Sequence, residues 1–325
     1  MKIAIGVDVG NYDTKTQNTV TPSSYRSSEM ENKLNSESLF YNGIYYMPTM
    51  ERNNQQLDKT INNYCIIMAL FGIAKQTIWQ IEHNFHEEND PDACITDEEM
   101  QKRIREIDKV ILGVGLPVGH FSSLAKKTVD CYNEVLGSGF SFVYRGFEFQ
   151  MKLVKCVAYP QDLTAVLYNN DVEIARDFDA YYICGIGGGT ADIIPVIDGE
   201  PQIEKCKSLE MGTTIMYEYI ATTIQHESGN MMEYSIIETI LLDKPSIIDE
   251  KRKTRVKELA KEFVDRLVAE FVHVGLKLSD YPCVFVGGGA LMMKKNLQSN
   301  PLFAKTEFVT DVNANAKYYA LFAEE

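Results

Sequence analysis

The sequence predicts an α/β protein built from two related halves. A buried strand near the N-terminus, residues 2–9, ends at a Gly10-Asn11 turn, and a second buried strand, residues 180–186, ends at a run of three glycines. A returning strand and several helices follow each turn, so the same order of elements occurs twice along the chain. The length of 325 residues is sufficient for two domains.

The first half alternates strands with helices. Alternating apolar residues predict the N-terminal strand, and Asn42-Gly43 between two aromatic runs predicts a hairpin. An apolar face from Asp58 to Trp79 predicts a long helix, and the polar residues 82–105 are expected to form an exposed loop that leads into another helix. The remaining expected elements are a strand at 110–116, a helix at 122–136, a hairpin at 140–149, a strand at 151–158 and a short helix at 162–169.

The second half begins with a strand, a glycine turn and a returning strand. Its other segments show the apolar periodicity of helices, with one further buried strand among them. The expected strands are 180–186, 191–197 and 282–286, and the expected helices are 213–225, 233–241, 250–278 and 313–322.

Composition and charge describe a globular protein with an acidic surface. Hydrophobic residues make up 45% of the chain, and the net charge is −14. This excess of acid argues against direct binding to nucleic-acid phosphates, so any contact with DNA is expected to pass through a basic partner. Seven cysteines without a CxxC pair indicate reduced thiols in a cytoplasm. Neither a signal peptide nor a membrane-spanning helix is expected.

The first glycine turn carries residues suited to a phosphate and a metal ion. Gly10, followed by Asn11 and Tyr12, permits backbone N–H groups to approach an anion. Asp8 at the strand end could hold the water shell of Mg²⁺, and Lys15 could reach a phosphate oxygen. An ordinary hairpin with a solvated lysine would show the same residues, so this turn alone is a weak signal.

The second glycine turn offers the same chemistry. Gly187, Gly188 and Gly189 follow a buried strand, where they are costly in backbone entropy, so a close approach to a ligand explains them better than chance. Thr190 can donate to a phosphate, and Asp192 can support the water shell of the metal ion. A returning strand follows, which excludes the Rossmann fingerprint, and the sequence contains no GxxxxGK[ST] loop.

A third glycine turn follows the strand at 282–286 and opens a helix. Its bare backbone would allow a flat purine ring to lie against it, although a tight strand–helix connection has the same composition. The residues assigned to nucleotide binding in the second half are therefore Gly187, Gly188, Gly189, Thr190, Gly212, Gly287, Gly288, Gly289 and Ala290.

The three turns together resemble the phosphate-1, phosphate-2 and adenosine motifs of the actin-like ATPase superfamily. Within it, the chain is similar to the ParM group of plasmid-segregating bacterial actins. The segments typical of that group are Asp8-Val9-Gly10-Asn11 with Lys15, Gly115-Leu116-Pro117, Gly287-Gly288-Gly289-Ala290 and Asn313-Ala314-Asn315-Ala316-Lys317.

This resemblance implies an actin-like fold, in which two related α/β domains enclose a nucleotide cleft. The first domain would span residues 1–165, completed by a helix at 313–325, and the second residues 166–312. The resemblance implies binding of ATP or GTP with Mg²⁺, polymerisation of the triphosphate form into a homopolymeric filament, and hydrolysis within that filament. It also implies segregation of plasmid DNA in the cytoplasm through a ParR-type adaptor on a centromere-like site, without direct contact with nucleic acid or membrane.

The same resemblance assigns the catalytic residues. Gln161 falls where the family places the residue that orients the attacking water, and Asp8 and Asp192 complete the catalytic set. Gln161 could equally be a polar neighbour of a helix N-cap. Gly185 stands where the family carries an aspartate near the metal ion, so binding is expected to persist while hydrolysis slows. Two alternatives therefore stay open: a slowly hydrolysing filament scaffold, and a small-molecule kinase of the superfamily, for which the sequence shows no catalytic-aspartate motif.

Two other polar clusters are expected to be solvated. His83 and His86 have helical spacing but too few companions for a metal site. The basic run at 251–257 is expected to form a solvated helix face, with a filament contact as the minority interpretation.

Overall fold

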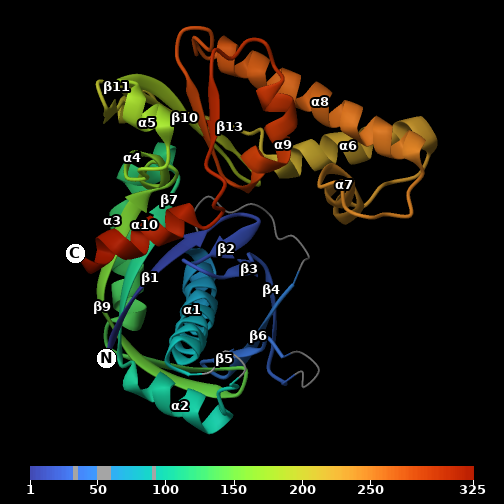
Figure 1. Cartoon of the computed structure of the whole chain (residues 1–325). Coiled ribbons are helices and arrows are strands. Elements are labelled where there is room, and N and C mark those ends of the chain that lie inside the picture. Colours follow the sequence, from blue (N-terminus) through green and yellow to red (C-terminus); the bar gives the residue numbers. More distant parts are fainter. Residues whose placement is uncertain (32–35, 50–59, 90–92) are drawn as a thin grey trace. The chain divides into compact units, whose positions relative to one another are not determined.

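The chain divides into two compact units in the computed structural model, which describes residues 1–31, 36–49, 60–89 and 93–325. Unit 1 comprises Met1–Thr164 and Asn313–Glu325, and unit 2 comprises Ala165–Val312. Figure 1 shows their strands and helices. Each unit has its own sheet and its own apolar core.

Unit 1 is built on a nine-stranded mixed sheet. From edge to edge its strands are β3 (Val20–Pro22), β2 (Asp13–Lys15), β1 (Lys2–Val9), β7 (Lys109–Leu116), β9 (Phe147–Pro160), β8 (Phe140–Tyr144), β5 (Leu39–Tyr41), β6 (Ile44–Pro48) and β4 (Tyr25–Ser28). The central strands β1, β7 and β9 run parallel to one another. All other neighbours pair antiparallel.

Two helices of unit 1 pack on opposite faces of the central strands. The helical segments of the unit are η1 (Ile61–Asn63), α1 (Tyr64–Glu88), α2 (Asp97–Glu106), α3 (Val118–Leu136) and α10 (Ala314–Glu324). Alternate residues of a strand point to opposite faces, so Ile5 of β1 joins the apolar core with α1, whereas Gly6 faces α10. A Cβ built on Gly6 would lie 1.8 Å from the carbonyl oxygen of Ala316, which places α10 directly on the strand (Figure 1).

Helix α1 begins and ends later than the sequence predicts. Its predicted start at Asp58 lies outside the described residues. Asn63 has a left-handed backbone with φ 54°, so the α-helix starts at Tyr64 after the turn η1. Residues 82–88, expected in an exposed loop, are helical because no Gly or Pro interrupts them. The helix expected after that loop is α2.

Helix α1 also passes a length-and-composition test for a membrane span, although the sequence predicted no such helix. It is the one helix among the described residues that passes it, and 78% of its most apolar window is buried within the protein. The core helix of a folded domain passes the same test.

Strand β9 is continuous where two separate segments were predicted. Its first part pairs antiparallel with β8 across the turn Arg145-Gly146, whose residues have φ of 53° and 83°. Its second part pairs parallel with β7, and the register of this pairing shifts between Val110 and Ile111. One long strand therefore connects the antiparallel part of the sheet with its parallel centre.

Unit 2 repeats the beginning of unit 1. Its strands are β10 (Ala180–Ile186), β11 (Ala191–Ile197), β12 (Glu200–Pro201), β13 (Lys207–Leu209), β14 (Cys283–Val286) and β15 (Thr306–Phe308). β10 pairs antiparallel with β11 and parallel with β14, as β1 pairs with β2 and β7. This shared arrangement agrees with the repetition that the sequence predicts.

The helices of unit 2 form most of its core. Its helical segments, beginning with one that starts at the last residue of unit 1, are α4 (Thr164–Leu167), α5 (Glu173–Asp177), η2 (Ile203–Lys205), α6 (Thr213–Ser228), α7 (Tyr234–Leu241), α8 (Glu250–His273) and α9 (Gly288–Gln298). α8 buries one apolar face, including Leu259, Phe263 and Leu267, and exposes its charged face.

Candidate functional site

The turn between β1 and β2 is closed tightly around Gly10. The Gly10 N–H donates to the carbonyl oxygens of Asp8, at 3.1 Å, and Asp13, at 3.0 Å. A Cβ at this position would lie 2.6 Å from the Asp13 oxygen, so the turn requires glycine. Gly10 therefore closes the turn with its own N–H, and Asn11 is the exposed residue at its tip. The side chain of Tyr12 is half-buried beside it.

Asp8 and Lys15 are direct neighbours across the same two strands. The register of β1 and β2 pairs Asp8 with Lys15, so both side chains point to one face of the sheet. Asp8 is 9% exposed, whereas Lys15 is half-buried. A carboxylate and an ammonium group on one face can address a metal ion and a phosphate, respectively.

Gln161 contacts Asp8 directly. It follows the end of β9, where its backbone N–H donates to the carbonyl oxygen of Leu116 at 2.8 Å. Its side-chain Nε2 donates to Asp8 Oδ1 at 2.5 Å. Asp162, which follows Gln161, has a left-handed backbone, and the next helix, α4, begins at Thr164. The structure thus brings two of the predicted catalytic residues together within unit 1.

Asn315 and Asp162 were missed by the sequence reasoning and join this pair. The Asn315 Nδ2 group donates to Asp162 Oδ1 at 3.0 Å and to Asp8 Oδ2 at 3.4 Å, and the Asp162 N–H donates to Asn315 Oδ1 at 3.0 Å. Asn315 lies 153 residues from Asp162 and 307 from Asp8 along the chain. The motif Asn313–Lys317 was recognised, but only the fold shows what its central asparagine contacts.

The second glycine turn uses its carbonyl groups and leaves two N–H groups available. The carbonyl oxygens of Gly187, Gly188 and Gly189 accept from the N–H groups of Thr213, Thr214 and Gly212 at 3.0, 2.7 and 3.0 Å. Within the described part of the chain, the N–H groups of Gly188 and Gly189 donate to no backbone carbonyl. Such a loop can bind an anion through its backbone.

The third glycine turn packs against the second one. A Cβ on Gly287 would lie 2.6 Å from the Ile186 carbonyl oxygen, and one on Gly289 would lie 2.7 Å from the same atom. Gly287 also has a φ of 98°. Two of the three glycines thus permit close packing, and Gly288 is the exposed one, while Ala290 is buried.

Gly185 and Asp192 are cross-strand partners on β10 and β11. Thr190 Oγ1 donates to Asp192 Oδ2 at 2.9 Å, so the hydroxyl group is oriented by the carboxylate. Because opposed residues lie close together, an aspartate at position 185 would stand beside Asp192. Burial, followed by the charge of Asp192, raises the pKa of the nearby Cys206 thiol to about 11.

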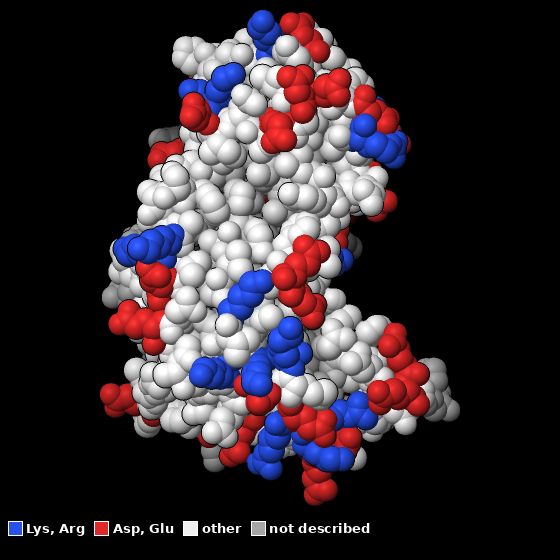
Figure 2. All heavy atoms as spheres, turned by 90° about the vertical axis from the view of Figure 1, so that its left-hand side faces the viewer, with Lys and Arg blue, Asp and Glu red and all other residues white. Residues whose placement is uncertain are grey.

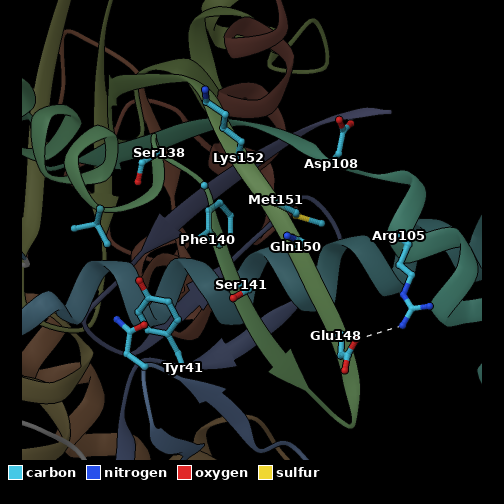
Figure 3. Close-up of a pocket in the computed structure, with 13 residues that line it drawn as sticks. Tyr41, Arg105, Asp108, Ser138, Phe140, Ser141, Glu148, Gln150, Met151 and Lys152 are labelled. Atoms are coloured by element: carbon cyan, nitrogen blue, oxygen red, sulfur yellow. Dashed lines mark hydrogen bonds and ion pairs between the residues drawn. The ribbon is translucent and has the colours of Figure 1, made fainter.

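A groove of about 930 Å³ in unit 1 lies apart from these residues. Figure 3 shows Arg105 and Lys152 with Asp108 and Glu148 among its lining, and Arg105 is paired with Glu148 at 3.3 Å. The groove lies at the start of β7, whereas Asp8 lies at the end of the parallel strand β1. It is thus at the opposite end of the sheet from the predicted site.

The solvated clusters behave as ordinary surface. Arg252, Lys253, Arg255 and Lys257 each pair with a neighbouring carboxylate, and Figure 2 shows basic side chains lying close to acidic ones on one face of the protein. His83 stacks on Trp79 at 4.8 Å. Among the described residues, no group of three His, Cys, Asp or Glu side chains could hold a metal ion.

Comparisons with known proteins identify the architecture. A family model described as the C-terminal part of the archaeal actin homologue MreB-like matches residues 183–299. The archaeal actin homologue Ta0583 aligns with a TM-score of 0.72 at 17% identity over 99% of both chains. The chain has an actin-like fold.

Further actin-like structures align over the whole chain. Ta0583 in complex with ADP gives a TM-score of 0.70 at 19% identity, over 99% of each chain. A 15-stranded ParM filament from Clostridium botulinum gives 0.68 at 13% identity, covering 100% of this chain and 99% of that one. Bacillus thuringiensis ParM with ATP gives 0.64 at 13% identity, covering 99% and 98%. No curated protein sequence matches this actin-like chain.

Proposed function

We propose that this actin-like chain binds ATP or GTP with Mg²⁺ and hydrolyses it within a filament of its own copies. The observation that carries the proposal is the Gln161–Asp8 contact beside the Gly10 turn, combined with a glycine loop in unit 2 whose N–H groups remain available. Actin-like structures with bound ADP and ATP support the nucleotide. The ParM filament of Clostridium botulinum supports self-association.

Each residue has a chemical role in this proposal. In unit 1, Lys15 would contact a phosphate oxygen. In unit 2, the Gly188 and Gly189 N–H groups would do so. Asp8 and Asp192 offer the carboxylate oxygens that Mg²⁺ prefers, and neither unit supplies a full set of ligands among the residues described. That donor set fits an ion that keeps several waters and reaches the protein together with phosphates. When bound, the ion would neutralise charge developing on the phosphates.

Gln161 would position the attacking water rather than deprotonate it. An amide is no base at neutral pH, and its Nε2 group is engaged on Asp8. The remaining acceptor, Oε1, can hold a water molecule in one orientation. Positioning of this kind suits a loose phosphoryl-transfer transition state.

We further propose that the filament segregates plasmid DNA in the cytoplasm through a ParR-type basic adaptor. The net charge of −14 supports an indirect contact with DNA, and we propose no direct contact with nucleic acid or membrane. Gly185 favours the slowly hydrolysing scaffold as the second candidate, because the position beside Asp192 carries no carboxylate. A small-molecule kinase of the superfamily would instead transfer phosphate to an acceptor.

The proposal is tested by mixing the protein with Mg²⁺ and ATP or GTP while light scattering and phosphate release are followed together. We expect scattering to rise and phosphate to follow. No rise with either nucleotide refutes the filament, and scattering without phosphate favours the scaffold. ADP or GDP formed without free phosphate, only when a small acceptor is present, indicates the kinase.

Gln161→Ala tests the catalytic assignment. We expect phosphate release to fall by about tenfold to a hundredfold, with nucleotide affinity preserved, because only water positioning is lost. Gln80→Ala is the matched control, since this glutamine bonds to Asn84 on the exposed side of α1. Equal rates for the two variants would exclude Gln161 from the reaction.

A further inference from the structure

Asn315 is a buried polar side chain that reaches two elements distant from it in the sequence. It lies in the first turn of α10 and is 8% exposed. Its amide contacts Asp8 at the end of β1 and Asp162 after β9. A buried amide with partners on two other elements fixes those elements relative to its own helix.

The chemistry of the partners determines the orientation of this amide. An ionised carboxylate only accepts hydrogen bonds, so the group that faces Asp8 and Asp162 must be the Nδ2 amino group. Asn315 Oδ1 then accepts from the Asp162 N–H at 3.0 Å. Both ends of the amide are used, because Nδ2 donates two hydrogen bonds and Oδ1 accepts one.

Asp162 is held in an unfavourable backbone conformation. Its φ is 65°, a left-handed value that is uncommon for a residue with a Cβ, although aspartate tolerates it better than most. Asn315 takes part in two of its hydrogen bonds: the Asp162 N–H donates to Asn315 Oδ1, and Asn315 Nδ2 donates to Asp162 Oδ1. On the preceding residue, Gln161, the N–H donates to Leu116 and the carbonyl accepts from the Leu163 N–H, both at 2.8 Å.

We propose that Asn315 is a positioning residue for hydrolysis, and this inference rests on the function proposed above. It orients Asp8 and fixes Asp162, so that the Gln161 Nε2 group stays on Asp8 and its Oε1 atom faces the attacking water in one orientation. Asn315 touches neither nucleotide nor water in this scheme. It acts through Gln161 and Asp8.

The charged side chains that Asn315 contacts are negative. Asp8 faces it from β1, Asp162 from the segment after β9, and Tyr319 lies one turn further along α10. Burial, and then the charges of Asp8 and Asp162, raise the pKa of Tyr319 well above its ordinary value. Two positive charges belong to neighbouring positions: Lys15 is the cross-strand neighbour of Asp8, and Lys317 lies two residues further along α10.

The test compares Asn315→Ala, Asn315→Asp and Asn313→Ala in the full chain, by phosphate release at saturating Mg²⁺-nucleotide and by nucleotide affinity. Asn315→Ala is expected to lower kcat by on the order of tenfold with the nucleotide Kd within about twofold, because two hydrogen bonds to charged groups are lost. Asn313→Ala is the matched control: this asparagine is the N-cap of the same helix, and its side chain donates to the Gln17 carbonyl. Its kcat should stay unchanged.

Asn315→Asp gives a readout that loss of packing alone would not produce. The new carboxylate faces Asp8 and Asp162, which disfavours its ionisation, so at neutral pH it should repel both and lower kcat more than alanine does. As pH falls, the protonated carboxyl regains one O–H donor and one acceptor, and kcat relative to the unaltered protein should rise.

Four outcomes would overturn the inference: an unchanged kcat in Asn315→Ala, a loss of nucleotide affinity alone, an equal loss in Asn313→Ala, or a kcat ratio for Asn315→Asp that does not change with pH. If Asn315→Ala does not fold, the isosteric aspartate variant decides by its pH profile. Absence of phosphate release from the unaltered protein would refute the proposed hydrolysis itself, and is thus distinguished from a failure of the Asn315 inference.

Discussion

Gly6→Ala should detach the C-terminal helix from the sheet of unit 1. The new Cβ would stand 1.8 Å from the Ala316 carbonyl oxygen, 2.7 Å from its carbonyl carbon and 2.9 Å from the Ala320 nitrogen. All three atoms belong to the backbone, so a change of rotamer cannot relieve the clash. The helix would have to retreat by roughly 1.5 Å to restore ordinary van der Waals contact.

The cost follows from what α10 buries. Its buried apolar residues are Ala314, Ala316, Tyr319, Ala320 and Ala323. One buried aromatic side chain and four methyl groups are worth roughly 5 kcal/mol in total. A gap of about 1 Å already forfeits up to about half of the contact energy, so a retreat of roughly 1.5 Å should lower the free energy of unfolding by about 3 kcal/mol or more.

Urea unfolding followed by circular dichroism measures this loss. With a slope of about 2–3 kcal/mol/M, the midpoint should fall by about 1 M. Gly119→Ala is the matched control, because no atom lies within 4 Å of its Cβ and it lies in the first turn of α3. That variant should be as stable as the unaltered protein or gain up to about 1 kcal/mol. A loss below about 1 kcal/mol in Gly6→Ala would refute the close packing of α10.

Three further outcomes are expected. Tyr319→Phe removes a buried hydroxyl group that has no hydrogen-bond partner among the described residues, so thermal denaturation should show an unchanged or higher Tm, and a loss above about 1 kcal/mol would contradict this. Gly185→Asp places a carboxylate opposite Asp192, so the Tm should fall in EDTA, where the two charges repel, and recover with Mg²⁺-nucleotide. Phosphate release should rise, whereas unchanged release would show that this position does not limit hydrolysis. Burial raises the pKa of Glu37, but contacts that include its hydrogen bond with Lys75 lower this pKa overall to below the ordinary 4.5. The ionised Glu37 therefore stabilises the fold above pH 4.5, and this stabilisation is lost as the pH falls through the lower pKa of the folded state. Lys75→Met should reduce stability at neutral pH and flatten the decline in acid, and parallel curves of the urea midpoint against pH for the two proteins would contradict this.

The fold was predictable where local signals and tertiary structure agree. The strands β1, β7, β10 and β14 are continuous apolar runs that end at Gly or Pro, so their limits are visible in the sequence. The limits of α1 were not visible, because its start depends on the left-handed Asn63 and its end on a polar surface that a helix tolerates as well as a loop does. The continuity of β9 was hidden, since it depends on pairing with two different strands.

The candidate site was predictable in its turns but not in its contacts. Gly10 and Gly287 are recognisable because few other residues tolerate such close backbone approaches, whereas a Cβ at Gly187 would lie no closer than 3.9 Å to another atom. The contacts of the third turn were not predictable: the backbone at Gly287 and Gly289 lies close to the Ile186 carbonyl oxygen. Nothing in the sequence joins Asn315 to Asp162, which lies 153 residues away. Only the path of the chain back to unit 1 brings them together.

That path has a consequence for the order in which the protein can be made. Unit 1 is completed by residues 313–325, which leave the ribosome only after all of unit 2 has been synthesised. Until then, Gly6 and Gly113 lie uncovered on one face of the sheet, and Asp162 lacks the hydrogen bonds from Asn315. A nascent chain can therefore form the Gly10 turn early but assembles the full Asp8 network last. Unfinished copies would lack the arrangement that we assign to hydrolysis.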